Sequence, residues 1–293
     1  MNHAEFLSSL SAETRAALPL CSDRAGLLHP VGHAGAIAVV SALILSRGPG
    51  WWLLLPVQGV LIVFLFTLEH ECTHRTPFAS DRLSGAVGHL TGALVVNPFW
   101  WFRFFHLAHH RFTNVAGDPE LDSRKPETRA QWLWHVSGLP LWGASLRLLR
   151  RLARGHEHPA CLPDRQRPRA EAEARALIAL CLAALASLSW SDAVLWLWLV
   201  PILLGQPALR LCLLAEHGDC PRTAEIFTNT RTTLTTRLVR FIAWNMPWHT
   251  EHHVHPGVPF HRLPRLHRLM RGYLRVTAPG HVALTRDDLA RRP

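Results

Sequence analysis

Residues 51–74 read WWLLLPVQGVLIVFLFTLEHECTH, an apolar run that ends in a short polar stretch with two histidines. As an α-helix, the uncharged residues 51–68 would extend roughly 27 Å, close to the thickness of the hydrocarbon core of a membrane. His70 and His74 follow, and because they are four residues apart they share one face of a helix. The sequence therefore predicts a membrane-spanning helix whose end presents two imidazoles.

Three other apolar segments extend this pattern along the chain. Residues 31–46 come before it, across a turn at 47–50, and the segments 174–190 and 193–214 follow later, with a turn at 189–192. Each turn is too short for anything but a direct return of the chain. We predict an all-α integral membrane protein with two transmembrane helical hairpins, four spans in all.

A fifth uncharged segment, residues 83–102, is also long enough to cross a membrane. A crossing there would place His106 on the opposite side of the membrane from His74, and the histidine clusters described below require both on one side. We therefore predict a re-entrant or interfacial segment, broken at Asn97 and Pro98 because proline interrupts a helix.

The charges orient these helices. The chain has 293 residues, with 31 Lys and Arg against 21 Asp and Glu and a net charge of +10. Only Arg47 lies in the two short turns, so the positive-inside rule places both termini and the long segment 69–171 in the cytoplasm. A soluble protein with buried helices is the alternative, but it would not need its charges segregated. Since topology accounts for the positive charge, we expect no nucleic-acid partner.

The same reasoning divides the chain into two parts. Residues 1–30 lack a continuous apolar core, and we expect a cytoplasmic or interfacial N-terminal segment. Residues 31–293 would form a single membrane domain. We expect this domain in a membrane, with its long middle segment on the cytoplasmic side.

Histidine is the unusual residue type, with 20 copies that cluster. His-x-x-x-His at 70–74 is followed by His-x-x-His-His at 106–110 and again at 249–253, each cluster beside a predicted membrane segment. Together they offer twice the ligands of a tetrahedral zinc site, so they suit two metal ions in a cytoplasmic helical cap. Imidazole binds iron, copper and zinc. The expected ligands are His70, His74, His106, His109, His110, His249, His252 and His253.

Further residues near these clusters have weaker signals. His217, in Glu216-His217-Gly218 just past the last span, is an expected ninth ligand. Asn245 could hold a metal-bound water or serve as a turn residue. Acidic residues are expected to orient the imidazoles without binding metal, and these candidates are Glu71, Asp118, Glu216 and Glu251. His261, His267 and His281 lie in a basic tail and are expected at the surface.

Two other readings of the histidines remain open. His70-Glu71-x-x-His74 also fits the zinc protease helix, in which the glutamate is the general base. An intramembrane zinc metalloprotease needs only one further ligand, however, and leaves the other two clusters unexplained. A metal or haem carrier would need polar groups along its spans, and residues 51–68 offer only Gln58 and Thr67.

The order and spacing of the three clusters resemble those of the membrane fatty acid desaturase and hydroxylase superfamily, from about Gly32 to His267. The fragment around His217 resembles the extra histidine motif of membrane alkane monooxygenases. Residues 229–233 and 244–267 look closest to a bacterial branch of hydrocarbon oxygenase-like proteins that includes the rhizopine-catabolism oxygenase. The third cluster also resembles that of carotenoid ketolases.

This resemblance implies a function and a set of partners. It implies a histidine-rich di-iron site with two Fe, and O2 as co-substrate. The reaction would be desaturation or hydroxylation of an unactivated C–H bond in a fatty-acyl, lipid or hydrocarbon substrate. A carotenoid or a small methylated compound is the alternative substrate. Asp118 lies in a Gly-Asp-Pro-Glu stretch like one that follows the second cluster in the family.

Electrons would have to come from outside this stretch of chain, because it contains no dinucleotide-binding motif and no cysteine set for an iron–sulfur cluster. The implied donor is a ferredoxin or similar small acidic carrier with its reductase. Residues 262–275 form a predicted amphipathic helix with arginines on one face. Anchoring on anionic membrane lipids is the favoured interpretation of this helix, and docking of the electron carrier is the alternative.

Overall fold

The computed structural model describes residues 1–122, 125–156 and 160–293. Within them the chain is mostly helical. Its helices are α1 (His3–Ser9), α2 (Ala12–Ala17), α3 (Asp23–Leu45), η1 (Trp51–Leu54), α4 (Leu55–Val63), α5 (Leu65–His74), α6 (Asp81–Val95), α7 (Phe99–Phe112), η2 (Pro119–Asp122), α8 (Arg129–Val136), α9 (Leu139–Arg154), η3 (Asp164–Gln166), α10 (Arg167–Ser187), η4 (Leu195–Leu199), α11 (Val200–His217), α12 (Ile226–Asn229), α13 (Arg237–Ile242), α14 (His249–Val254), α15 (Leu263–Met270) and α16 (His281–Arg291). Two short strands, β1 (Thr232–Thr233) and β2 (Thr277–Ala278), pair in parallel.

Three helices of the described chain are long and apolar enough to cross a membrane. They are Asp23–Leu45, Trp51–His74 and Leu195–His217. The first begins well before the expected residue 31, because Ser22 caps it with a side chain that accepts from the N–H of Ala25. The fourth expected span, 174–190, lies in α10. That helix is not among the three, and its first half carries Arg167, Arg169, Glu171, Glu173 and Arg175.

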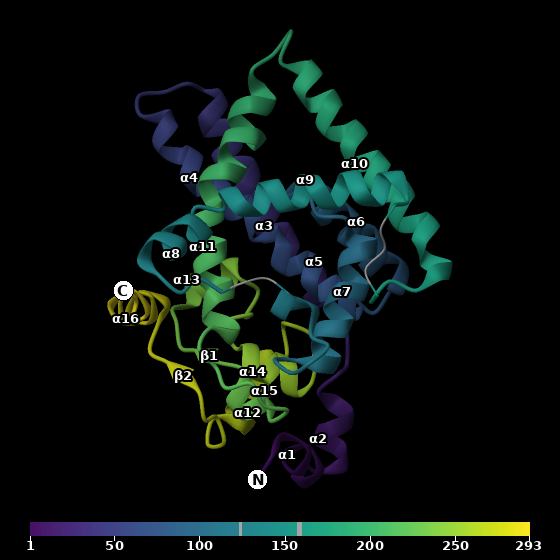
Figure 1. Ribbon diagram of the computed structural model, residues 1–293, viewed down its shortest axis with the longest axis vertical. Helices are drawn as coiled ribbons and strands as arrows, with labels where there is room; N and C mark the ends of the chain where they lie inside the picture. The colour runs from purple at the N-terminus through teal and green to yellow at the C-terminus, as the bar shows by residue number, and fades with distance from the viewer. Residues whose placement is uncertain (123–124, 157–159) are drawn as a thin grey trace.

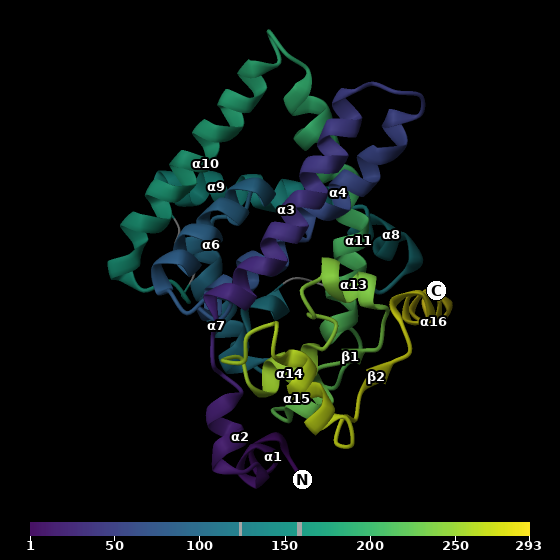
Figure 2. The ribbon, with the colours of Figure 1, turned by 180° about the vertical axis from the view of Figure 1, so that it is seen from behind.

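These helices are arranged as two hairpins that point the same way (Figure 1). The loop between α3 and α4 and the tip between α10 and α11 lie at one end of the molecule, and α9 crosses below them, between α11 and the far end of α10. The opposite end holds α1, α2, α12, α14 and α15, as the view from behind also shows (Figure 2). The expected N-terminal segment, residues 1–30, comprises α1, α2 and the first turns of α3.

The segment 83–102 divides into two helices. α6 ends at Val95, Val96 adopts a left-handed conformation, and α7 begins at Phe99, so the chain breaks at Asn97 and Pro98 as expected. The amide of Asn97 donates to Glu69 of α5, at 3.1 Å from each carboxylate oxygen. Further along α7, the Arg103 side chain donates to the carbonyl of Thr73. The turn therefore brings α7 back along α5. As a result, the histidines at 70–74 of α5 and those at 106–110 of α7 lie side by side.

A close backbone approach joins the two hairpins. At Gly59 of α4 an added Cβ would lie 2.1 Å from the carbonyl oxygen of Pro201, and at Gly205 of α11 it would lie 2.3 Å from the carbonyl carbon of Gly59. Only residues without a side chain allow such contact, and small residues serve this purpose between membrane helices. Since α5 continues α4, this contact also sets where His70 and His74 lie relative to the end of α11.

Replacing Gly205 with alanine should therefore destabilise the protein. The new methyl group meets backbone atoms that cannot rotate away, and overpacking of this kind costs about 1–3 kcal/mol. The measurement is the thermal unfolding temperature in detergent. Gly35→Ala in α3 is the matched control, because nothing lies within 4 Å of a Cβ added there. Equal unfolding temperatures for the two variants would contradict the close packing.

The end away from the hairpin tips has an apolar core of its own. Phe6 of α1, Leu18 after α2, and Phe227 of α12 are fully buried there. They form one cluster with Met246, Trp248, Val254, Val258, Leu263, Leu266 and Met270. The N-terminal helices thus pack on the C-terminal third of the chain and hold α14 and α15 in place.

Candidate metal centre

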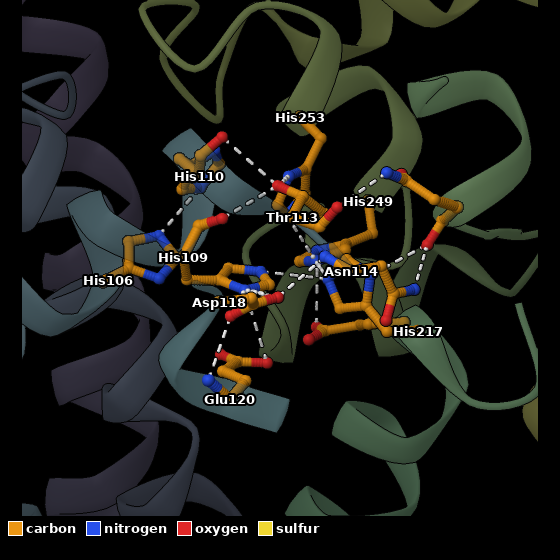
Figure 3. Close-up of polar contacts among 12 residues, drawn as sticks. His106, His109, His110, Thr113, Asn114, Asp118, Glu120, His217, His249 and His253 are labelled. Carbon is orange, nitrogen blue, oxygen red and sulfur yellow. Dashed lines mark hydrogen bonds and ion pairs between the residues drawn. The ribbon is translucent and has the colours of Figure 1, made fainter. Parts of the chain in front are cut away.

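The nine histidines that the spacing singled out come together in two adjacent groups. The ligand atoms within each group lie within 4.8 Å of one another. The larger group contains His70, His74, His106, His110 and His252. The smaller group contains His109, His217, His249 and His253, and Figure 3 shows these four with part of the larger group.

Helix geometry explains which histidine joins which group. An α-helix turns about 100° per residue, so residues four apart nearly coincide in direction, whereas consecutive residues diverge. His106 and His110 accordingly share the larger group, and His109 turns to the smaller one. In α14 the pair His249 and His253 shares the smaller group, and His252 turns to the larger one. Each His-x-x-His-His cluster therefore serves both groups.

The smaller group has its ring protons fixed on the side away from its centre. Nδ1 of His109 lies 2.9 Å from Oδ1 of Asp118, and Nδ1 of His217 lies 3.2 Å from the carbonyl oxygen of Asn229. A carboxylate and a carbonyl only accept, so both Nδ1 atoms must carry the hydrogen. In the neutral rings, Nε2 is therefore unprotonated and carries a lone pair.

His253 follows the same rule through Thr113. The Thr113 hydroxyl donates to the carbonyl of His109 at 3.0 Å, so its oxygen is free to accept from Nδ1 of His253 at 3.1 Å. Three of the four rings in the smaller group thus carry their hydrogen on Nδ1. Their Nε2 atoms all point inward (Figure 3).

The inward nitrogens of the smaller group lie close to one another. His217 Nε2 lies 3.2 Å from His109 Nε2 and 2.9 Å from His249 Nε2, which in turn lies 3.0 Å from His253 Nε2. His109 and His217 both carry their hydrogen on Nδ1, so in neutral rings their facing Nε2 lone pairs repel unless a cation lies between them. Two nitrogens bound at right angles to a metal at about 2.1 Å are roughly 3.0 Å apart, so the spacing suits a bound metal ion.

The larger group shows the same spacing. His106 Nε2 lies 2.9 Å from Nε2 of both His74 and His110, and His110 Nε2 lies 3.1 Å from His252 Nε2. The groups abut where the rings of His110 and His253 stack, with centroids 4.1 Å apart and planes inclined by 15°. Two metal ions held this way would be neighbours in one buried chamber.

Burial keeps most of these rings neutral. Burial lowers the pKa values of five of them well below the ordinary value of histidine, and neighbouring imidazoles lower these values further. The five are His106, His110, His249, His252 and His253. A neutral imidazole has the lone pair that a metal needs. The centre can therefore accept cations at neutral pH.

His109 differs from these histidines, because its pKa is raised and it is paired with Asp118. Burial raises the pKa of Asp118, but its hydrogen bonds with His109 and with the backbone N–H groups of Asn114 and Glu120 outweigh that effect and hold the pKa below its ordinary value. Burial lowers the pKa of His109, but Glu120 and Asp118 together raise it above its ordinary value. Asp118 is therefore ionised.

Three of the four expected orienting carboxylates lie beside ring nitrogens. Besides the Asp118 contact, Oε1 of Glu216 lies 3.6 Å from Nδ1 of His249, and Oε1 of Glu71 lies 3.8 Å from Nδ1 of His252. The other oxygen of Glu71 accepts from the N–H of Phe260 at 2.9 Å and from the Thr76 hydroxyl at 3.0 Å. These bonds tie Glu71 to the protein, which disfavours the general-base role it would have in a zinc protease.

Two expected residues have other partners. Glu251 is fully buried and accepts from Thr232 at 2.7 Å, and its second oxygen lies 2.5 Å from Nδ1 of His267. The described contacts include none between Glu251 and the nine histidines. Asn245 adopts a left-handed backbone conformation, and its amide donates to the carbonyl of Phe260 at 3.0 Å, so it acts as a turn residue.

The sequence analysis missed several supporting residues. The expectation of a surface position is wrong for His267, whose side chain is 17% exposed and stacks on Trp248 with centroids 4.6 Å apart. Asn229 is fully buried, and besides accepting from His217 it donates to the carbonyl of Thr113 at 2.9 Å. Asn229 begins the Asn-Thr-Arg-Thr-Thr run at 229–233. Its contacts join segments that are far apart in the sequence, so local spacing does not reveal them. His261 and His281 are half-buried.

Two cations hold the end of α11, where His217 lies. The Lys125 amino group donates to the carbonyl of His217 at 3.1 Å. Arg231, which is 7% exposed, donates to the carbonyls of Ala215 at 2.8 Å and Gly218 at 2.6 Å. The last carbonyls of a helix lack partners within it and carry its negative dipole end, so both cations stabilise this end.

Membrane-length helices that carry two buried groups of imidazoles define a class of membrane metalloprotein. A model of the fatty acid desaturase family matches residues 49–283, which include all nine histidines. The chain therefore belongs to the fatty acid desaturase family, a family of oxidoreductase enzymes.

Individual relatives match a shorter part. The chain is 36% identical over 80 residues to the sn-1 oleoyl-lipid 12-desaturase of a Picosynechococcus species, which covers 26% of this chain and 23% of that protein. It is 33% identical over 107 residues to the endoplasmic reticulum omega-3 fatty acid desaturase of Vigna radiata, covering 34% and 28%. It is 30% identical over 86 residues to the sn-1 acyl-lipid omega-3 desaturase (ferredoxin) of a Nostoc species, covering 28% and 23%. The matches span about a quarter of the length of these relatives.

Proposed function

We propose that the two histidine groups hold two iron ions and that the protein is a membrane-bound, O2-dependent fatty acid desaturase. His70, His74, His106, His110 and His252 would hold one iron, and His109, His217, His249 and His253 the other. The observation that carries the proposal is the convergence of nine imidazoles in two groups, in the smaller of which three rings keep their hydrogens on Nδ1 and turn Nε2 inward. The donor set is nearly all imidazole, which suits iron.

The proposed reaction balances with an external supply of electrons. A –CH2–CH2– unit, O2, two electrons and two protons become –CH=CH– and two molecules of water. O2 takes up four electrons, two from the broken C–H bonds and two from the carrier. The two bound irons would supply the one-electron redox chemistry that links O2 to the C–H bonds.

The residues of the chain would provide the setting for this chemistry. Asp118, the Asn229 carbonyl and Thr113 keep three imidazoles in one orientation, and such partners also raise the basicity of the ligand nitrogen. Glu71 and Glu216 lie beside two more rings. The smaller group is fully buried, which excludes bulk water from it, and His74 and His110 of the larger group are half-buried.

A lipid-linked fatty-acyl chain is the substrate that the relatives favour. The three relatives described above are named for oleoyl-lipid, acyl-lipid or fatty acid desaturation. Hydroxylation at the same carbon, or oxidation of a hydrocarbon, a carotenoid or a small methylated compound, would use the same centre and is distinguished by the product. One relative is named for ferredoxin, which fits a ferredoxin and its reductase as electron donors.

The proposed topology has four spans with both termini in the cytoplasm of a bacterial cell. α10 would cross the inner membrane and be joined to α11 at a tip that lies at the same end of the molecule as the loop between α3 and α4, although the two helices splay apart below that tip (Figure 1). The positive charge on the side of the histidines supports this orientation. The active site would then face the cytoplasm, in a single membrane domain over 31–293 that follows the segment 1–30.

The test is a lipid analysis of bacterial cells that express the protein together with a ferredoxin and its reductase. We expect a new double bond in membrane fatty acids, located by mass spectrometry, and about two irons per chain in the purified protein. Expression of the His253→Ala variant at the same level is the control and should leave the lipids unchanged. An added hydroxyl group would assign hydroxylation instead. One zinc without iron, and no change in lipids, would overturn the proposal.

A further inference from the structure

We propose that the exposed arginine face of α15 is the docking surface for the acidic electron carrier. This inference rests on the proposed function, since only a redox enzyme needs such a carrier. The surface consists of Arg265, Arg268 and Arg271, all exposed. They recur at intervals of three residues, so they lie along one side of the helix and its C-terminal end.

The apolar face of α15 is already occupied. Leu263, Leu266 and Met270 are fully buried in the cluster that also contains Phe6 and Leu18. An amphipathic helix that lies on a membrane must insert its apolar face among the lipids. Of the leucines and the methionine of α15 only Leu269 is exposed, so the helix has little apolar surface left for lipid and the expected anchoring role loses its main support.

The position of α15 also argues against the membrane. In both views it lies at the end of the molecule away from the tips of the two hairpins, next to α1, α2 and α14 (Figures 1 and 2). If the hairpins cross the membrane, the arginines face the aqueous phase. A soluble partner can reach them there.

The three arginines keep their charge available. At the flanks of the helix, Arg262 donates to the carbonyl of Ala17 at 3.0 Å and Arg275 to that of Met1 at 3.2 Å. Among the described residues, no ion pair involves Arg265, Arg268 or Arg271. A cluster of unpaired guanidinium groups attracts a partner with a negative surface and speeds its association. The small acidic carrier has the complementary charge.

Contacts of His267 link the helix that carries this surface to the helix that carries three candidate ligands. His267, on the inner side of α15, has Nδ1 at 2.5 Å from Oε1 of Glu251, and Glu251 precedes the candidate ligand His252 in α14. The His267 ring stacks on Trp248, with planes inclined by only 5°, and Trp248 precedes the candidate ligand His249. Two short paths thus connect the docking surface with the two histidine groups, one to each.

The transfer at this surface would move one electron at a time. The reduced carrier would give up one electron, and the iron held by the histidine groups would take it up. The carrier then leaves, and a second reduced carrier completes the two electrons that each turnover needs. Such exchange requires a weak, rapidly reversible contact, which a cluster of surface charges provides.

The test is a binding measurement between the full chain in neutral-lipid nanodiscs and a plant-type [2Fe–2S] ferredoxin, at low and at high salt. In the variant Arg265→Glu, Arg268→Glu, Arg271→Glu, we expect affinity to fall at least about tenfold and its salt dependence to flatten. The matched control makes the same charge change on α9, with Arg147→Glu, Arg150→Glu and Arg154→Glu, whose residues are also exposed. It should change affinity less than about twofold.

Iron content and circular dichroism of both variants show whether they fold. Unchanged affinity in the folded α15 variant, an equal loss in the α9 variant, or no binding by the unmodified protein would overturn the inference. So would an α15 variant that still binds ferredoxin but no longer binds phosphatidylglycerol vesicles, which would assign α15 to lipid. Binding that depends on α15 without any lipid product would leave the docking surface standing and overturn the proposed reaction instead.

Discussion

Alanine in place of His109 or His252 is expected to abolish the oxidation of lipid and to lower the iron content from about two per chain to about one or fewer. The two residues belong to different groups, so each variant should lose a different iron first. Activity should fall at least about 100-fold, because the neighbouring imidazoles cannot supply the missing lone pair.

The measurement combines elemental analysis with Mössbauer spectra of protein labelled with iron-57. The spectrum of each variant should retain the signal of the iron bound by the untouched group, so the two variants should give different residual spectra. His156→Ala is the control, because His156 is exposed and belongs to neither group. Full activity with either ligand variant would contradict the assignment.

Asparagine in place of Asp118 should weaken the centre without removing a ligand. Asp118 accepts from the His109 ring and also from the N–H groups of Asn114 at 2.7 Å and Glu120 at 2.9 Å. An amide has one oxygen for these donors and turns an N–H group toward the others. The His109 ring then loses its fixed orientation, and metal affinity should fall about 10- to 100-fold, the usual effect of losing such a partner.

Iron retention is measured as the rate at which a chelator removes the iron, and lipid oxidation is measured in the same samples. Asp122→Asn serves as the matched control, because Asp122 is an exposed carboxylate of the same loop. The release rate of the control should equal that of the unmodified protein. If Asp118→Asn also released iron at the unmodified rate, the carboxylate would have no part in holding His109.

Local spacing was sufficient to predict the helical membrane class and to single out eight of the nine histidines that the fold brings together, and His217 was predicted from its place just past the last span. Both signals are short-range. An apolar run has the length of a membrane whatever surrounds it, and residues three or four apart share a helix face. Their role as iron ligands stays a prediction. Even the division of His106, His109 and His110 between two groups follows from the angle per residue.

The hydrogen-bond partners of those histidines could not be predicted from local spacing. Asn229 accepts from His217 and bonds to Thr113, and the latter lies more than a hundred residues away in the chain. The function of α15 depends on distant residues too, because Phe6 and Leu18 cover an apolar face that by itself favoured a membrane. Amphipathicity indicates that a helix has a face to bury, but only tertiary packing determines whether lipid or protein buries it. Hydrogen bonds and burial between distant segments depend on how the whole chain packs in three dimensions. The local periodicity of the sequence does not determine that packing.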